Sequence, residues 1–150
     1  MLLIMSVLAK LLQSYSKNHQ NPTNEFIHIV AIPIILFSIV GGISAINMSL
    51  TYFTVGIVFF YYLKLSKMAG LVMFSWLGIY LVLVELLKPY IVEISVFLFI
   101  FGWALQFFGH YIEGEKPSFF DDLRHFLIGP LFVVYKLFEK FGIKIFTDNN

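Results

Sequence analysis

Four long apolar runs constrain most strongly what this chain can fold into. Three of them, residues 26–46, 68–87 and 91–112, are each about twenty residues long, which is enough for a helix to cross roughly 30 Å of hydrocarbon. The remaining run, residues 51–63 and second in chain order, has only thirteen residues and by itself would also fit a re-entrant or buried segment. Extending it to residues 48–65 makes a short span. The sequence therefore predicts an all-α integral membrane bundle of about four transmembrane helices, formed by a single domain over residues 1–150.

The composition excludes several classes of protein. Hydrophobic residues make up 59% of the chain and charged residues only 13%, which leaves too little polar surface for a water-soluble fold. No basic stripe is interleaved with aromatic residues, so nucleic acid is not an expected partner. The absence of cysteine excludes disulfides, iron–sulfur clusters, thiolate zinc sites and a cysteine nucleophile. Any metal ion must be held by nitrogen and oxygen ligands.

The distribution of Lys and Arg tests the four-span arrangement. If the apolar segments cross the membrane in alternation, one side holds nine of the ten basic residues and the other holds Lys88 alone. Because cytoplasmic loops carry the excess of positive charge, we expect both termini on the cytoplasmic side of a bacterial inner membrane or of the endoplasmic reticulum. The first ten residues, MLLIMSVLAK, lack a basic leading region and a cleavage site, so we expect them to be retained.

The segments at the two ends of the chain are too polar to span. Residues 1–17 and 117–146 mix apolar side chains with charged ones, a pattern typical of amphipathic helices that lie in the membrane interface. Gly129-Pro130 is expected to break the second segment into two helices, because proline lacks the backbone N–H that a helix interior needs.

All four histidines fall on the same predicted side of the membrane as the nine basic residues. Asn21 and Pro22 form a helix start, with Asn21 as the N-cap. Taken singly, the polar residues nearby are caps, interfacial residues or hydrogen bonds between helices. Because the polar residues of two different spans are expected at the same depth in the membrane, the sequence favours a functional site. At helical spacing, the first span carries Asn21, Asn24 and His28, and the fourth carries Trp103, Gln106, His110 and Glu113.

The residue types at this level limit the chemistry. Imidazole suits zinc, copper, nickel or ferrous iron, and Glu113 is placed to complete a coordination sphere or to orient a histidine. Four histidines are too few for the di-iron centres of membrane desaturases and hydroxylases. His28 and His110 lie too near the rim for a b-type haem within the bilayer. Serine hydrolase chemistry lacks support, because no G-x-S-x-G occurs.

Two motifs carry a family resemblance. The first is HQNPTNEFIH, from His19 to His28, and the second is QFFGHYIE, from Gln106 to Glu113. Together they resemble the 2-hydroxy fatty acid dioxygenase family, small membrane proteins of fungi and bacteria. The resemblance covers most of the chain and implies an enzyme that uses Fe(II), a 2-hydroxy fatty acid and dioxygen. It also implies α-oxidation, in which the fatty acid one carbon shorter is formed and carbon dioxide is released.

The resemblance also implies which residues act. It implies His19, His28, His110 and Glu113 as the catalytic and metal-binding residues. Beside them, the candidates for hydrogen bonds to the substrate headgroup are Tyr15, Asn24 and Gln106. His125 lies outside both motifs, so a fourth ligand and a surface histidine are both open for it.

A second interpretation is a non-catalytic membrane scaffold or lipid-binding protein, in which the polar faces only hold helices together. Under that interpretation no metal copurifies, and histidine variants lose stability rather than turnover. Under the first, the acyl tail of an amphiphilic substrate lies in the apolar interior while its headgroup stays at the membrane interface.

Overall fold

The computed structural model describes residues 6–17, 19–114, 116, 124–143 and 145–146. These residues form six α-helices and one short 3₁₀-helix, with no strand among them. In chain order the elements are α1 (Val7–Lys17), α2 (Pro22–Ile46), α3 (Met48–Leu65), α4 (Lys67–Leu86), η1 (Lys88–Tyr90), α5 (Ile91–Glu113) and α6 (Arg124–Lys140). The predicted all-α fold is confirmed.

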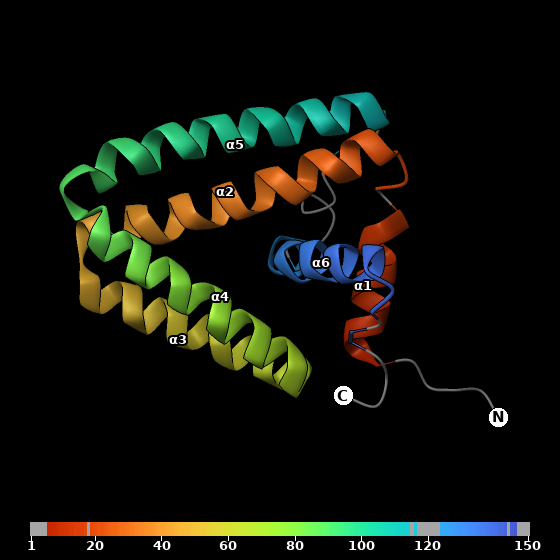
Figure 1. Ribbon diagram of the computed structural model, residues 1–150, viewed down its shortest axis with the longest axis horizontal. Coiled ribbons are helices and arrows are strands. Elements are labelled where there is room, and N and C mark those ends of the chain that lie inside the picture. Colours follow the sequence, from red (N-terminus) through yellow and green to blue (C-terminus); the bar gives the residue numbers. More distant parts are fainter. Residues whose placement is uncertain (1–5, 18, 115, 117–123, 144, 147–150) are drawn as a thin grey trace.

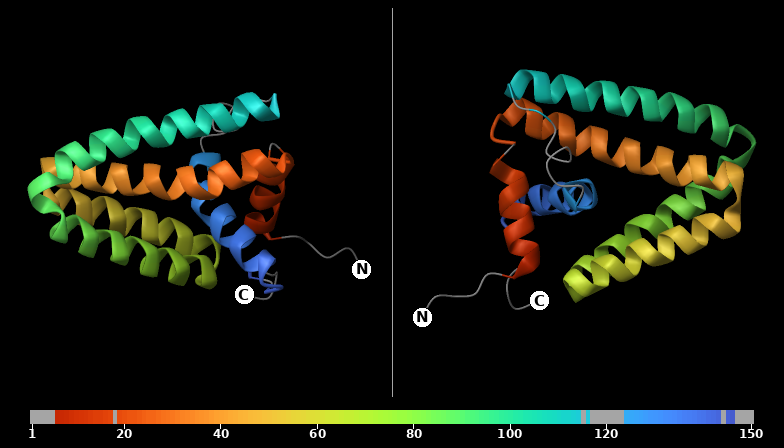
Figure 2. Two further views of the ribbon diagram at one scale, coloured as in Figure 1. Left: turned by 45° about the horizontal axis from the view of Figure 1, so that its top comes forward. Right: turned by 180° about the vertical axis from the view of Figure 1, so that it is seen from behind.

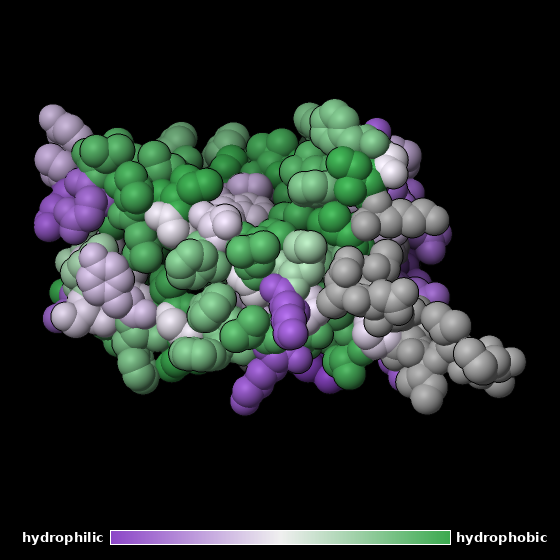
Figure 3. All heavy atoms as spheres, turned by 60° about the horizontal axis from the view of Figure 1, so that its bottom comes forward, coloured by the Kyte–Doolittle hydropathy of each residue, from purple (hydrophilic) through white to green (hydrophobic). Residues whose placement is uncertain are grey.

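Four of these helices, α2 to α5, are long and apolar enough to cross a membrane. α3 has 18 residues, with the bounds that the extension of the short apolar run predicted. Large apolar side chains such as Phe53, Phe74 and Phe97 are exposed on the outside of the bundle, and Figure 3 shows a face that apolar side chains largely cover. An exposed apolar surface of this extent is typical of contact with lipid, so the chain is a membrane protein.

The long helices form two antiparallel pairs, α2 with α5 and α3 with α4, which diverge from one end like the arms of a V (Figure 1). The arms join at the turn between α2 and α3, and the views in Figure 2 show the same opening from other directions. α6 and α1 pack against each other in the open mouth of the V, where α6 also contacts α2. The mouth is therefore closed by the two terminal helices.

Single residues make the turns between α2 and α3 and between α3 and α4. The backbone N–H of Asn47 donates to the oxygen of Ile43 and closes α2, while its side chain accepts from the N–H of Leu50 at 2.9 Å and caps α3. Ser66 does the same for the next turn, with its hydroxyl accepting from Ala69 at 2.9 Å. Because one side chain satisfies each new helix start, the successive helices need no longer loop.

Small residues let α5 lie close against α2. Ser95, Gly102 and Gly109 are spaced seven residues apart on α5, and all three are buried. A Cβ atom added to Gly102 would lie 2.6 Å from a side-chain carbon of Ile35, and one added to Gly109 would overlap the side-chain oxygen of Asn24. This stripe brings the two backbones together along the whole pair.

Of the two adjacent glycines in α2, Gly41 and Gly42, one packs closely against α5. A Cβ atom on Gly41 would overlap the hydroxyl of Ser95, whereas one on Gly42 would meet nothing within 4 Å. Only Gly41 faces α5.

The prediction of a helix break at Gly129-Pro130 is wrong, because α6 runs from Arg124 to Lys140 through Pro130. The proline removes one backbone hydrogen bond. Burial offsets this loss, since residues 128–134 are all buried and Gly129 lies against Ile32 of α2. The middle of α6 thus belongs to the protein core rather than resting one face on the membrane surface.

α1 buries one face, through Leu8, Leu11, Leu12 and Tyr15, and so has the predicted amphipathic pattern. Of the two segments predicted to be interfacial, residues 1–5, 117–123 and 144 lie outside the described residues.

Candidate metal centre

His19 lies in the connection between α1 and α2 and is 3% exposed. Its Nδ1 donates a hydrogen bond to the backbone oxygen of Tyr15 at 2.8 Å, and the Tyr15 ring stacks on the imidazole with centroids 4.2 Å apart. Because a carbonyl oxygen only accepts, the proton of the neutral ring sits on Nδ1, which leaves a lone pair on Nε2. That Nε2 atom is buried and has no hydrogen-bond partner in the described part of the chain.

The environment of His19 keeps its ring neutral. Burial lowers the pKa of His19 to about 4, and the hydrogen bond to Tyr15 and the negative charge of Glu113 oppose this only in part. Burial also raises the pKa of Tyr15, so its phenol stays protonated. At pH 7 His19 is therefore available as a metal ligand, because a metal binds the neutral imidazole.

His28 repeats this arrangement inside α2. The residue is completely buried, and its Nδ1 donates to the backbone oxygen of Asn24, four residues earlier, at 2.9 Å. In the neutral ring this again leaves Nε2 with its lone pair. The same device, a histidine bonded to the carbonyl one turn before it, thus orients both rings.

His110, on the last turn of α5, completes the group. Its Nε2 lies 3.1 Å from Nε2 of His28. One nitrogen from each of His19, His28 and His110 lies within 4.8 Å of the others, and all three residues are buried. Three nitrogen atoms at these separations can hold one metal ion.

The three residues fit a metal ion. The donors are all imidazole nitrogens, a set that suits iron, zinc, copper or nickel. Backbone carbonyls hold two of the rings through Nδ1, which is the usual way in which a second layer of hydrogen bonds orients metal-binding histidines. The buried Nε2 of His19, which has no hydrogen-bond partner in the parts of the chain that the structure describes, supports the same assignment, because an unsatisfied buried polar atom is costly. Three protein ligands leave coordination positions open for other molecules.

Glu113, which the sequence predicts as a ligand, lies beside this group but outside it. Its carboxylate accepts hydrogen bonds from the backbone N–H of Gln20 at 2.9 Å, from that of Asn21 at 3.1 Å, and from Nδ2 of Asn24 at 2.9 Å. A carboxylate in this place satisfies N–H groups at the start of α2 and complements the helix dipole. The end of α5 is thereby fixed to the start of α2; a role as ligand stays a prediction.

Asn24 links Glu113 to His28. Its amide donates to Glu113 and its backbone oxygen accepts from Nδ1 of His28, while its side chain packs against Gly109. The expected hydrogen bond from Asn24 to a substrate stays a prediction.

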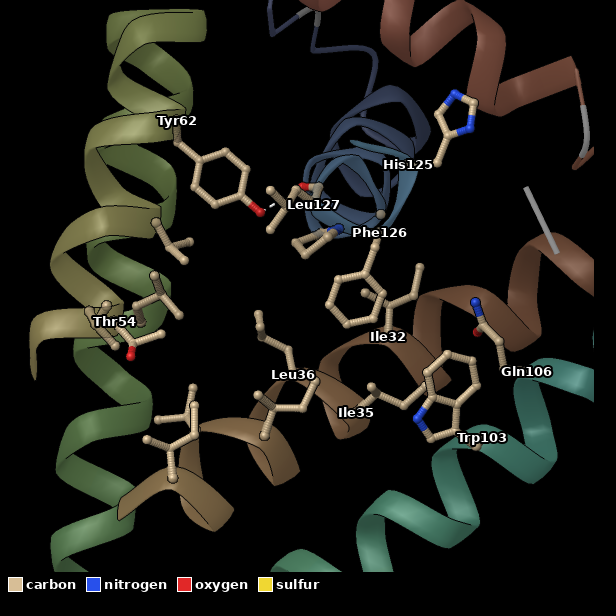
Figure 4. A pocket seen from close by; sticks show the side chains of 18 of the residues that line it. Ile32, Ile35, Leu36, Thr54, Tyr62, Trp103, Gln106, His125, Phe126 and Leu127 are labelled. Carbon is tan, nitrogen blue, oxygen red and sulfur yellow. Dashed lines mark hydrogen bonds between the residues drawn. The ribbon is translucent and has the colours of Figure 1, made fainter. Parts of the chain in front are cut away.

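A cavity of about 230 Å³ lies beside the histidines and is lined by residues of α2, α3, α5 and α6 (Figure 4). His110 lines it together with Tyr15, Gln106 and His125. Most of the remaining lining is apolar, and Figure 4 shows Ile35 and Leu36 along its α2 wall. The histidine cluster therefore borders an apolar chamber that has polar groups at one end.

Two of the three predicted substrate-binding residues, Tyr15 and Gln106, line this cavity. The side-chain oxygen of Gln106 is buried and has no hydrogen-bond partner within the described residues. His125 also lines the cavity and stands edge-on to Tyr15, with ring centroids 5.9 Å apart. Because His125 is only 6% exposed, its interpretation as a surface histidine is wrong, and it is not one of the three clustered histidines.

Two supports of the site were not predicted from the sequence. The stripe of Ser95, Gly102 and Gly109 had a signal, a seven-residue repeat of small residues. Tyr62 of α3 donates to the backbone oxygen of Leu127 on α6 at 2.6 Å, beside the cavity, as Figure 4 shows. The sequence has no signal for this second contact, because it depends on where α6 lies.

Comparison with known proteins identifies the family that the two sequence motifs resemble. A family described as "2-hydroxy-palmitic acid dioxygenase Mpo1-like" matches residues 5–141. The 2-hydroxy-palmitic acid dioxygenase MPO1 of Saccharomyces cerevisiae is 30% identical over 142 residues, which cover 85% of this chain and 78% of the yeast protein. No solved structure matches.

Proposed function

We propose a reaction for this chain from the premise that it belongs to the Mpo1-like family. The reaction is the Fe(II)-dependent α-oxidation of a 2-hydroxy fatty acid. One molecule of the acid and one of dioxygen give the fatty acid one carbon shorter, carbon dioxide and water. The observation that carries the proposal is the buried group of His19, His28 and His110 at the polar end of an apolar cavity.

The three histidines would hold the iron, and bound ferrous iron would supply the electrons that make dioxygen reactive toward the substrate. The protein's part is to hold the rings still: the carbonyls of Tyr15 and Asn24 fix two of them through Nδ1. Glu113 holds α5 against the start of α2, so that His110 stays at the level of the other two. These contacts prearrange the nitrogens before any ligand binds.

The polar end of the cavity suits the head of a 2-hydroxy acid. Three neutral imidazoles leave the charge of a divalent ion uncompensated, and a carboxylate brings the opposite charge. The protonated phenol of Tyr15 can donate a hydrogen bond, and the side-chain oxygen of Gln106, which has no partner among the described residues, can accept one from a hydroxyl group. The apolar walls exclude water from the alkyl chain.

The charge distribution of the sequence also supports a location. We propose that the site lies on the cytoplasmic side of the membrane, because the turn at Lys88 lies at the end of the helices away from the histidines, and alternating spans would put the other nine basic residues of the sequence on the histidine side. Single cysteines at positions 64 and 88, labelled with an impermeant maleimide, should react from opposite sides.

Metal analysis tests the proposed cofactor. The detergent-purified protein is reconstituted with ferrous iron without oxygen, freed of excess metal and assayed for iron, beside His28→Ala. We expect bound iron in the wild type and none in the variant, with helical content retained in both. A wild type that binds no iron, together with a variant that only loses stability, would favour the scaffold interpretation instead.

A further inference from the structure

The cavity beside the histidines is elongated along two helices. On α2 its lining runs from Ile32 to Ile43, and on α3 from Thr51 to Tyr62, with the residues of each stripe at helical spacing. The two helices meet at the Asn47 turn, so the cavity has a far end between Ile43 and Thr51, away from the histidines. Its near end is at His110.

Two threonines line the far end of the cavity, but their hydroxyls are already hydrogen-bonded to the backbone. The hydroxyl of Thr51 donates to the backbone oxygen of Asn47 at 3.0 Å, and that of Thr54 donates to the oxygen of Leu50 at 2.9 Å. Both hydroxyls are thus satisfied within α3. In contrast, the near end holds Gln106, whose buried oxygen is unpartnered among the residues that the structure describes. This polarity suits a molecule with a polar head at the histidines and an alkyl tail toward Asn47.

The length of the cavity matches a fatty acyl chain. α2 rises about 1.5 Å per residue, so the eleven steps from Ile32 to Ile43 span about 16 Å. An extended alkyl chain has bonds of about 1.5 Å and advances about 1.3 Å per carbon, so about twelve carbons fill this length.

We propose that this cavity holds the alkyl chain of the 2-hydroxy fatty acid between α2 and α3, and that Ile43, Thr51 and Thr54 at its far end set the longest chain that the enzyme accepts. The inference rests on the proposed function, and it adds a residue-level determinant of chain length. The acid is favoured as the occupant over a membrane phospholipid, because the cavity is continuous with His110 and, among the residues that the structure describes, a buried acceptor without a partner lies at that end, on Gln106, whereas the threonine hydroxyls of the far end are hydrogen-bonded.

The chain-length profile tests this inference. The ratio of kcat/KM for a 16-carbon to that for a 10-carbon 2-hydroxy acid is measured for the wild type and for Thr54→Phe, which fills the far end. The ratio should fall by about tenfold or more, since a misfit of a few methylene groups costs at least that much. Ile57→Phe is the matched control, because Ile57 is on α3 but is 55% exposed on its outer side, and its ratio should stay at the wild-type value.

A second variant keeps the test decisive if the Thr54→Phe protein does not fold. Ile43→Ala enlarges the same end of the cavity, and the longest acid turned over should lengthen by one or more carbons. An active wild type whose profile is unchanged by both variants would overturn the inference while leaving the proposed function intact.

A binding experiment needs no turnover and so separates the two proposals. A 2-hydroxy fatty acid with a photoreactive diazirine at its terminal carbon is irradiated with the protein, and the labelled residues are found by mass spectrometry. Labelling of Ile43, Thr51 or Thr54 supports the inference even if the wild type turns over no substrate. Labelling confined to outward residues such as Ile57 and Phe60, or labelling that an excess of phospholipid abolishes, would overturn it.

Discussion

The Nε2 atoms of His28 on α2 and His110 on α5 lie 3.1 Å apart, although 82 residues separate the two histidines in the sequence. Their closeness depends on how tightly the two helices pack. Gly109, next to His110, has its Cα against the side chain of Asn24, and Asn24 in turn holds the ring of His28. The geometry of the histidine cluster thus depends directly on the packing of α2 against α5.

Gly109→Ala should therefore damage the metal centre without changing a ligand. The added methyl group would overlap the oxygen of Asn24 and push α5 away, at a cost of about 1–3 kcal/mol for an overpacked core. We expect weaker iron binding and a lower unfolding midpoint. Gly42→Ala is the control, because its methyl group would meet nothing within 4 Å and both properties should match the wild type. Equal iron affinity in Gly109→Ala would show that the site tolerates separation of the helices.

Variants of Glu113 distinguish a role in capping the start of α2 from a role as a metal ligand. Replacing it with Ala leaves the N–H groups of Gln20 and Asn21 without their acceptor, which should lower the free energy of unfolding by about 2 kcal/mol. Glu113→Gln keeps one acceptor oxygen and should lose less. If Glu113 only fixes the start of α2, the electronic spectrum of a bound cobalt probe should be the same in Glu113→Gln as in the wild type. A changed spectrum at unchanged stability would identify Glu113 as a ligand.

Loss of His125 should weaken substrate binding, whereas loss of His28 should abolish iron binding. Because His125 lines the cavity but is not one of the clustered histidines, His125→Ala should retain iron and raise the KM for the substrate. His28→Ala should lose iron. Iron content and steady-state kinetics on the same preparations separate these outcomes, and loss of iron from His125→Ala would make His125 a fourth ligand.

The ion pair of Lys136 with Glu25 ties α6 to α2 at 3.0 Å, where both side chains are about four-fifths buried. Lys136→Met should lower stability by about 1 kcal/mol, since it leaves Glu25 partly buried without its partner. Lys140→Met, one turn later on the exposed end of α6, is the matched control and should have no effect. Unfolding in increasing denaturing detergent measures both, and equal midpoints for the two variants would contradict a role for this pair.

The spans were predictable because each depends on local composition. A run of apolar residues long enough to cross a membrane is visible in the sequence, and Asn21, Asn47 and the Lys88 turn mark helix boundaries through their own chemistry. The clustering of His19, His28 and His110 was also predictable, because their two motifs place them at the same depth in the membrane.

The remaining features depend on tertiary contacts. The two oxygens of Glu113 point to α2 because of how α5 is rotated, which its spacing from His110 does not reveal. Pro130 does not end α6, because burial among α1, α2 and α3 outweighs one lost hydrogen bond. The burial of His125 is a consequence of the same placement of α6.

Product analysis with the iron-loaded enzyme tests the central claim most directly. Wild type, His19→Ala, His28→Ala and His110→Ala are each incubated with a 2-hydroxy fatty acid in oxygenated buffer, and the fatty acid one carbon shorter is measured against the dioxygen consumed. We predict one shorter acid per dioxygen in the wild type and none in the three variants. Full activity in all three variants, or no shorter acid from an iron-loaded wild type, would contradict the account.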